Sequence, residues 1–407
     1  MAAGTTPTGP LTGIRVLEVA MYGFVPSAGA VLADWGADVI KVEHAVTGDP
    51  QRGLRQIGTF VVEGDPNPNI EHANRGKRSI GIDMAQPEGR DIVHALAESA
   101  DVFLTSFLPA HRARFGIDVD DIRAVNPSII YARGSGLGPR GAESGKGGYD
   151  MTAFWCRGGV AATITPSDVP GMVTPPPALG DTISGTNLAG GIAAALVRRG
   201  LTGEPSVVDV SLLSSALWSM GHAIALSAYA GEPMVAGPSG AHGAPANPLV
   251  GLYATADGRH LSFVMMQPAK FWADVCAHID RPELADDPRF ATAESIAEHT
   301  ADAVAILRAA IGARTLAEWT EKLATLAGPW APVQDSHQVL ADPQVVANEY
   351  IRTAGELRLV ASPVQFDVGA PALTPGPEFA AQTDEILGEL GLDWDRIIAL
   401  KTAGAVT

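Results

Sequence analysis

The tetrapeptide Ala178-Leu179-Gly180-Asp181 places a carboxylate where it could act as a nucleophile. The glycine before Asp181 leaves room for a ligand to approach the backbone. The segment 183–199 is rich in Ala and Leu, has apolar residues at helical spacing and ends before Gly200, which predicts a helix. Asp181 then lies at or just before the helix N-terminus, where free N–H groups and the helix dipole keep the carboxylate ionised. An ionised carboxylate can attack an acyl carbon, although an Asp at this position is most often only a helix cap.

Size and composition predict a soluble globular protein of two or three domains. The chain has 407 residues, of which 46% are hydrophobic and 18% charged. It shows no signal peptide and no apolar run long enough to cross a bilayer, so we expect a cytoplasmic location and no membrane partner. Only Cys156 and Cys276 occur, which argues against a disulfide framework, and we expect no metal site. The net charge of −17 argues against binding to nucleic acid.

Basic residues are nevertheless concentrated in the first third of this acidic chain. They are either solvated surface charges or the parts of a site for an anionic ligand. The three sets are Lys41, Arg52 and Arg55; Arg75, Lys77 and Arg78; and Arg112 and Arg114.

The first half of the chain alternates strand and helix patterns, which predicts an α/β fold. Such a pattern gives a parallel sheet with helices on both faces and a ligand site beyond the carboxyl ends of the strands. The turn at 21–26 after the first strand is not a G-x-G-x-x-G fingerprint, and the sequence contains no P-loop. The glycine-rich segment 134–141 follows a strand and leads into more loop, so it is either a ligand-side loop or a plain connection. We predict strands at 14–19, 38–42, 79–82, 101–105, 128–132 and 206–210, and helices at 27–35, 87–98, 117–125 and 212–230.

The composition changes at the Gly/Pro-rich segment 237–245, which is a candidate linker or mobile cover. His242 within it could act as an acid or base, but a lone His in such a loop more often faces solvent. Beyond the segment we predict a smaller α+β domain. It contains a hairpin at 251–264 with an Asp-Gly turn and helices at 268–280 and 300–326, and a late helix follows at 384–390.

Ordered motifs along nearly the whole chain resemble the family III CoA-transferases, the CaiB/BaiF group that includes formyl-CoA transferase and the α-methylacyl-CoA racemases. Any one motif is a weak marker, but this many in the right order are specific. They are Leu32-Ala33-Asp34-Trp35-Gly36-Ala37-Asp38-Val39-Ile40-Lys41-Val42-Glu43, Asn74-Arg75-Gly76-Lys77-Arg78-Ser79, Ala178-Leu179-Gly180-Asp181, Ala256-Asp257-Gly258 and Asp286-Asp287-Pro288-Arg289-Phe290.

This resemblance implies a Rossmann-like large domain built from both ends of the chain, a smaller α+β domain, and an interlocked homodimer. The implied domain limits are 1–225 and 356–407 for the large domain and 251–330 for the small one, with linkers at 226–250 and 331–355. The implied substrates are an acyl-CoA and a carboxylic acid, with no permanently bound cofactor.

In that family the Asp of the Gly-Asp motif is the covalent nucleophile, and Asp181 matches it. The resemblance therefore implies attack by Asp181 on an acyl-CoA thioester. A mixed anhydride and CoA thiolate would form, followed by an aspartyl-CoA thioester from which an acceptor acid takes the CoA. Covalent catalysis of this kind divides one transfer into easier exchanges.

The resemblance also implies a set of CoA-binding positions. Phe107 could stack on adenine, and Arg75 and Arg114 could bind phosphates. Three positions depart from the transferase pattern, since Gly23 replaces a Gln, His44 a common Arg, and Ser106 a usual Asn. The full set is Tyr22, Gly23, His44, Arg75, Ile82, Ser106, Phe107 and Arg114.

Two alternatives to CoA transfer remain open, a racemase and an acyl-CoA-binding protein that has lost turnover. Racemases use a His and a Glu where this chain has Tyr149 and Gln267, and neither side chain suits proton transfer near neutral pH. Asp150 either supports the site or is a hydrogen-bonded loop carboxylate. Phe154 and Trp155, with Met265 and Met266, either line a pocket for a bulky apolar acyl group or belong to the core.

Overall fold

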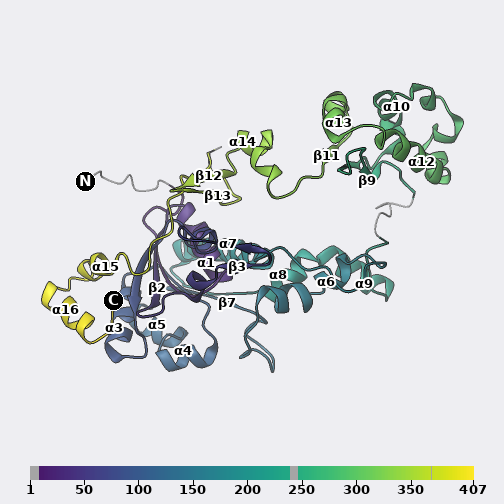
Figure 1. Cartoon of the computed structure of the whole chain (residues 1–407). Coiled ribbons are helices and arrows are strands. Elements are labelled where there is room, and N and C mark those ends of the chain that lie inside the picture. Colours follow the sequence, from purple (N-terminus) through teal and green to yellow (C-terminus); the bar gives the residue numbers. More distant parts are fainter. Residues whose placement is uncertain (1–8, 239–245, 368) are drawn as a thin grey trace. The chain divides into compact units, whose positions relative to one another are not determined.

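The computed structural model of the chain describes residues 9–238, 246–367 and 369–407. The chain divides into two compact units (Figure 1). The first comprises Met1–Ile164, Met172–Met234 and Pro343–Thr407, and the second comprises Thr165–Gly171 and Val235–Asp342. Most of the segment 237–245, including His242, lies outside the described residues.

A six-stranded parallel sheet forms the centre of the first unit, in the order β5-β2-β1-β6-β7-β8. This confirms the predicted α/β class. The order corresponds to the doubly wound 3-2-1-4-5-6 arrangement, in which the chain reverses direction between the two central strands, here β1 and β6. The strands are β1 (Arg15–Val19), β2 (Asp38–His44), β5 (Arg78–Ile82), β6 (Val102–Thr105), β7 (Ile130–Ser135) and β8 (Val207–Ser211).

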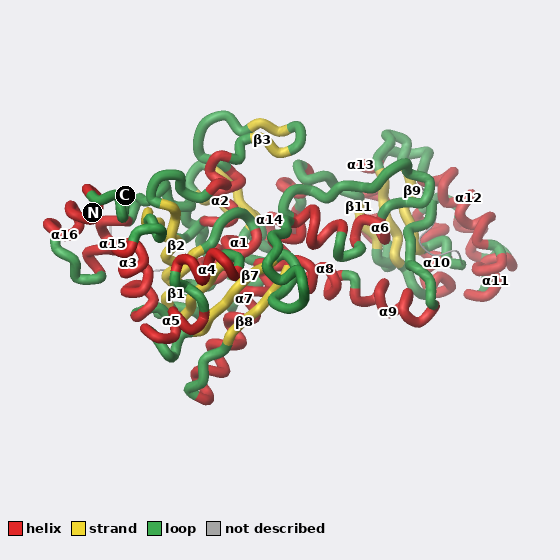
Figure 2. The backbone as a smooth tube through the Cα atoms, turned by 90° about the horizontal axis from the view of Figure 1, so that it is seen from below, coloured by secondary structure: helices red, strands yellow, loops and turns green. Residues whose placement is uncertain are grey.

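Helices cover both faces of this sheet, because successive strand residues point to opposite sides (Figure 2). Val16 belongs to one apolar core and its neighbour Leu17 to the other. The first core includes α1 (Phe24–Asp34), α7 (Leu179–Thr202) and α8 (Leu212–Ser219). The second includes α3 (Pro87–Glu98), α5 (Val119–Val125), α15 (Thr383–Glu389) and α16 (Trp394–Thr402).

Helices α1 and α7 lie against each other in the first core (Figure 1). A Cβ on Gly185 of α7 would lie 2.7 Å from the Cβ of Ser27 on α1, so the two backbones approach closely at this point. This contact holds the first turn of α7 beside the turn that joins β1 to α1.

The remaining elements of the first unit are shorter. They are η1 (Pro50–Gly53), β3 (Gln56–Ile57), β4 (Phe60–Val61), α2 (Pro68–Asn74), α4 (Pro109–Phe115), the π-helix η2 (Asp150–Cys156), α6 (Val160–Ile164), α9 (Gly221–Ala230), α14 (Pro343–Ala347), β12 (Ile351–Ala354) and β13 (Leu357–Val360).

The second unit is a three-stranded sheet with helices, in the order β11-β10-β9. Its strands are β9 (Val250–Ala254), β10 (His260–Val264) and β11 (Trp330–Pro332), and Gly258 has a positive φ of 73° in the predicted Asp-Gly turn between the first two. Its helices are α10 (Pro268–His278), η3 (Pro282–Ala285), η4 (Pro288–Phe290), α11 (Ala293–Glu298), α12 (Thr300–Ile311), α13 (Leu316–Lys322), η5 (Leu323–Thr325) and η6 (Gln338–Ala341).

Several predicted elements differ from the structure in their limits. The helix predicted at 212–230 is divided into α8 and α9 at Met220, and the helix predicted at 300–326 is divided into α12 and α13, with Thr315 capping the second piece. Apolar periodicity continues across both breaks, so the pattern alone did not show them. No helix among the described residues is long and apolar enough to cross a membrane.

Candidate active site

Asp181 lies in the first turn of α7, as its third residue. The helix begins earlier than predicted, at Leu179, so Asp181 is not the cap; the N-cap is Ala178, with a left-handed φ of 55° and no side-chain cap hydrogen bond. Burial and, secondarily, the negative charge of Asp150 raise the pKa of Asp181 from 3.8 to about 7. The expectation of a firmly ionised carboxylate was therefore wrong, because desolvation outweighs the helix dipole at this site.

Asp150 contacts this same turn from η2. Its Oδ1 accepts a hydrogen bond from the Gly180 N–H at 3.0 Å. Burial raises the pKa of Asp150, while hydrogen bonds from the N–H groups of Gly180 and Leu179 act in the opposite direction. The structure thus brings two sequence-predicted carboxylates to one helix end.

Gly23, at the start of α1, faces the Asp181 carboxylate. A Cβ at this position would lie 2.5 Å from Asp181 Oδ2, so the absence of a side chain is what admits the carboxylate. The preceding residue, Tyr22, has a positive φ of 65°, and its ring meets the Tyr149 ring edge-on at 5.7 Å between centroids. The Tyr22 N–H donates to Asp49 Oδ1 at 3.2 Å, which holds the turn.

A network of buried, charged side chains stabilises this turn. Lys41 pairs with Asp49 at 2.8 Å and with Glu18 at 3.3 Å, and its Nζ also donates to the carbonyl of Ala20 at 3.0 Å. Lys77 pairs with Glu18 at 2.7 Å, and the side chains of Lys41, Glu18, Asp49 and Lys77 are fully buried. Because each charge has a partner, the network fixes the loop that follows β1.

A hollow of about 340 Å³ lies at the carboxyl ends of the central strands. Residues that follow or end β1, β2, β5 and β6 line it, which is where a doubly wound sheet binds its ligands. Met21 lines the hollow and Gly23, two residues later, faces Asp181, so residues of one turn contact both the hollow and the carboxylate.

Four of the eight predicted CoA-binding residues line this hollow, namely His44, Ile82, Phe107 and Arg114. Phe107 packs edge-on against Phe115 at 5.8 Å between centroids, and the exposed Arg114 guanidinium lies 5.5 Å from the centre of the Phe115 ring. His44 Nδ1 accepts the N–H groups of two following residues, at 3.2 and 3.3 Å, which leaves Nε2 as a donor.

The other four predicted residues lie elsewhere. Tyr22 and Gly23 are in the turn beside Asp181, and the Ser106 hydroxyl accepts the N–H of Met21 at 3.1 Å, so it joins the ends of β6 and β1. Arg75 is not at the hollow. It forms a buried ion pair with Asp34 at 2.7 Å, with side-chain exposures of 4% and 3%.

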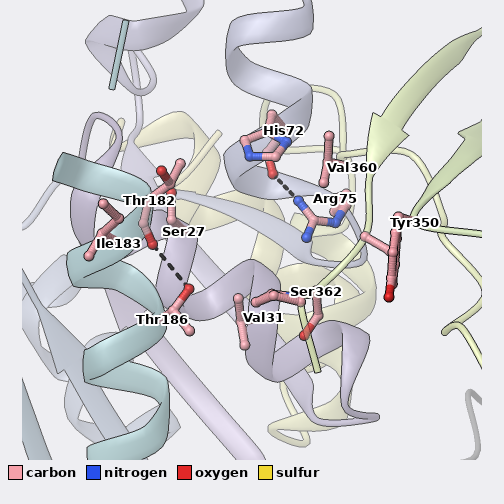
Figure 3. Close-up of a pocket in the computed structure, with 12 residues that line it drawn as sticks. Ser27, Val31, His72, Arg75, Thr182, Ile183, Thr186, Tyr350, Val360 and Ser362 are labelled. Atoms are coloured by element: carbon pink, nitrogen blue, oxygen red, sulfur yellow. Dashed lines mark hydrogen bonds between the residues drawn. The ribbon is translucent and has the colours of Figure 1, made fainter. Parts of the chain in front are cut away.

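Arg75 instead lines a second cavity of about 630 Å³, with His72, Thr182 and Tyr350 among the other lining residues (Figure 3). Burial lowers the pKa of His72 to about 4, so this His is neutral at physiological pH. The side chains around this cavity are mainly apolar and hydroxylic, and the cationic Arg75 is already paired.

The remaining candidate residues have different environments in the structure. Phe154 and Trp155 are buried at 2% and 3% exposure in the core beneath α7, so they are packing residues, and Met265 is fully buried in the second unit. Tyr149 is 62% exposed. Gln267 belongs to the second unit, where it precedes α10 as its N-cap.

Sequence reasoning missed the residues that hold the turn, above all Asp49 and Glu18. Both are charged residues at or after predicted strands, where surface exposure is the usual expectation. Their buried roles become evident only from the residues with which they pair. Among the described residues, no group of three or more His, Cys, Asp or Glu side chains is arranged to hold a metal ion.

Fold and site together define a class: a doubly wound α/β protein with a ligand hollow at its strand ends and a half-buried carboxylate across the adjoining turn. The model of CoA-transferase family III matches residues 11–382, and the chain belongs to that family. It is 31% identical to (R)-2-hydroxy-4-methylpentanoate CoA-transferase of Clostridioides difficile, over 97% of this chain and 99% of that one.

Two further comparisons agree. The chain is 30% identical to cinnamoyl-CoA:phenyllactate CoA-transferase of Clostridium sporogenes, over 94% of each chain. The crystal structure of a CaiB/BaiF family protein from Brucella suis superposes with a TM-score of 0.82 at 26% identity, covering 94% of this chain and 99% of that one. The protein is thus a CoA-transferase by family, which transfers CoA between an acyl-CoA and an acid.

Proposed function

We propose that this protein transfers CoA through a covalent intermediate on Asp181. The observation that carries the proposal is the placement of the half-buried Asp181 carboxylate across one turn from the hollow at the strand ends. A pKa of about 7 leaves a large ionised fraction at neutral pH and makes the ionised form a stronger nucleophile than an ordinary carboxylate.

In the first half-reaction, an oxygen of ionised Asp181 attacks the thioester carbon of the acyl-CoA. The C–S bond breaks, and the CoA thiolate leaves with the electron pair. The thiolate then attacks the aspartyl carbon of the mixed anhydride, which releases the donor acid as a carboxylate and leaves CoA on Asp181 as a thioester.

In the second half-reaction, the acceptor carboxylate attacks the same aspartyl carbon and expels the thiolate. The thiolate attacks the acceptor's acyl carbon in the new anhydride, which gives the product acyl-CoA and restores the Asp181 carboxylate. No proton or water is consumed, so exclusion of water protects both reactive intermediates from hydrolysis.

The nucleotide end of CoA would occupy the hollow at the strand ends. Phe107 offers a ring face for adenine, and Arg114 and the Nε2–H of His44 offer donors to phosphate oxygens. The pantetheine arm would then pass the turn at Met21 and bring the thioester to Asp181.

The acids transferred by the relatives guide the choice of substrates. The names of the two transferases include a branched 2-hydroxy acid and aromatic acids. We propose apolar monocarboxylic acids of that size as the first candidates for this chain.

We also propose that the protein is a homodimer, interlocked as the family resemblance implies. Helix α9 has an apolar composition, yet none of its residues is buried in the single chain. Trp218 and Tyr229 are 81% and 93% exposed. Apolar side chains in such number on two successive helices, α8 and α9, suit an interface with a second copy.

The covalent step is tested by incubating the protein with a panel of acyl-CoAs, trapping with hydroxylamine and locating the adduct by mass spectrometry. We expect a hydroxamate on Asp181, and a loss of transfer on the order of 10⁴-fold in Asp181→Asn. Asp91→Asn, which changes an exposed carboxylate on α3, is the matched control and should transfer at the wild-type rate.

The outcomes separate the three readings of the sequence. Transfer without a trapped adduct would contradict the covalent route. Exchange of the α-hydrogen with deuterium from solvent, without transfer, would favour a racemase. Binding of CoA with neither reaction would favour a protein that has lost turnover.

A further inference from the structure

Asp150 caps α7 from a distant part of the chain. The residue in the local N-cap position, Ala178, provides no side-chain hydrogen bond. Asp150, 30 residues before Gly180, accepts the N–H of Gly180 at 3.0 Å and that of Leu179 as well. One carboxylate therefore accepts hydrogen bonds from two of the N–H groups that have no partner within the helix.

Asp150 is held firmly in this position. It begins the π-helix η2, a rare conformation that is often found at functional sites. A Cβ on Gly180 would lie 2.3 Å from Asp150 Oδ1 and 2.3 Å from Phe154 Cγ, so η2 and the first turn of α7 are in direct contact. Trp155 anchors the other end of η2 by donating its Nε1–H to the carbonyl of Val173 at 2.8 Å.

The carboxylate that caps α7 also acts on Asp181 through space. After desolvation, the negative charge of Asp150 is the next cause that raises the pKa of Asp181. A second carboxylate near a nucleophilic one disfavours its ionised form and increases its basicity.

We infer that Asp150 is a positioning residue for the reaction at Asp181: its carboxylate fixes the first turn of α7 and so aims the Asp181 carboxylate at the thioester. The inference rests on the proposed covalent function. It adds a role for a residue that takes no part in the bond-making steps.

The other ionisable groups around this turn do not provide the hydrogen bonds and the negative charge that Asp150 provides. The Tyr22 phenol comes from the β1–α1 turn and the Tyr149 phenol from the residue before η2, and their rings contact each other. On the strands beneath α7, Arg133 and Asp209 form an ion pair with each other.

Two substitutions separate geometry from charge. Asp150→Asn keeps an acceptor oxygen for the two N–H groups but removes the charge, whereas Asp150→Ala removes both. Glu143→Gln is the matched control, because Glu143 pairs with Lys146 and Arg157.

The assay is the single-turnover rate of adduct formation on Asp181 as a function of pH. In Asp150→Asn we expect the acid limb to move to lower pH, by up to about one pH unit, because loss of the neighbouring negative charge lowers the pKa of Asp181. In Asp150→Ala we expect a loss of about 10²-fold in the acylation rate with little change in KM, because the nucleophile is misplaced while CoA binding is not.

Hydrogen exchange of the peptide covering 178–184 gives a readout that does not depend on activity. Exchange should accelerate in Asp150→Ala, with a smaller change in Asp150→Asn and none in Glu143→Gln. A wild-type pH profile in Asp150→Asn together with a wild-type rate in Asp150→Ala would overturn the inference alone. Absence of any adduct in the wild-type protein would overturn the proposed function and, with it, the positioning role assigned to Asp150.

Discussion

Replacing Gly23 by Ala places a single methyl group against the Asp181 carboxylate. The added Cβ would lie 2.5 Å from Asp181 Oδ2 and 3.2 Å from its Cγ. Ordinary van der Waals contact begins at 3.4 Å, so the oxygen must retreat by about 0.9 Å, the difference of the two distances. Gly23 has a right-handed backbone conformation, with φ of −88°, so Ala introduces no backbone strain.

A displacement of this size at a nucleophile is expected to cost about 10²-fold in rate. The global fold should not suffer, because Gly→Ala at a compatible backbone conformation stabilises a protein by about 0.4–1 kcal/mol. We therefore expect the Gly23→Ala protein to have a melting temperature no lower than that of the wild type and a much reduced kcat.

The assay measures CoA transfer and the trapped Asp181 adduct, together with thermal unfolding. Gly190→Ala is the control, since Gly190 lies on α7 and a Cβ there would meet nothing within 4 Å. Its activity should equal that of the wild type. If Gly23→Ala transferred CoA within threefold of the wild-type rate, the assigned role of the Gly23 contact would be wrong.

Three further predictions concern the surroundings of the site. Lys41→Met leaves the buried Asp49 carboxylate without its cationic partner and should lower the free energy of unfolding by about 3–5 kcal/mol in urea titrations, against less than about 1 kcal/mol for Lys146→Met at an exposed pair. Arg114→Ala should raise the KM for acyl-CoA about tenfold with little change in kcat, whereas Arg396→Ala, at an exposed position on α16, should change neither. Burial and the neighbouring carboxylate raise the folded-state pKa of Asp181 above its ordinary 3.8. The unfolded chain therefore loses this proton at a lower pH than the folded protein, and the free energy of unfolding falls as the pH rises toward about 7. Asp181→Asn should for this reason raise the melting temperature more at pH 8 than at pH 5.

Much of the fold could be predicted because its elements are specified locally. Strands β1, β2, β5 and β6 are short and almost wholly buried, and α3 begins at Pro87 with a first-turn Glu88, which marks its start in the sequence. The break at Met220 and the extra turn at the start of α7 carry no comparable local signal. Both depend on packing against other elements, which outweighs local propensity.

The site could be predicted only in part, because charges acquire their roles from partners distant in sequence. Arg75 looked available to a phosphate, but Asp34 pairs with it from α1 across 41 residues. His44, in contrast, ends an edge-proximal strand at the carboxyl side of the sheet, and topology alone brings it to the hollow. Residues placed by strand ends were therefore predictable, while those placed by side-chain pairing were not.

The ionisation of Asp181 also depends on a side chain that is distant in sequence. Helix position argues for a lowered pKa, and that argument is sound for an exposed helix end. At this end, however, the N–H groups of Leu179 and Gly180 are already taken by Asp150, so they are not free to stabilise a charge on Asp181. The same contact that fixes the turn thus removes the donors that would have held the nucleophile in its least reactive state, and it adds a like charge beside it. Positioning and activation of Asp181 therefore follow from one carboxylate, which is why substitution by Asn and by Ala at position 150 should give different results.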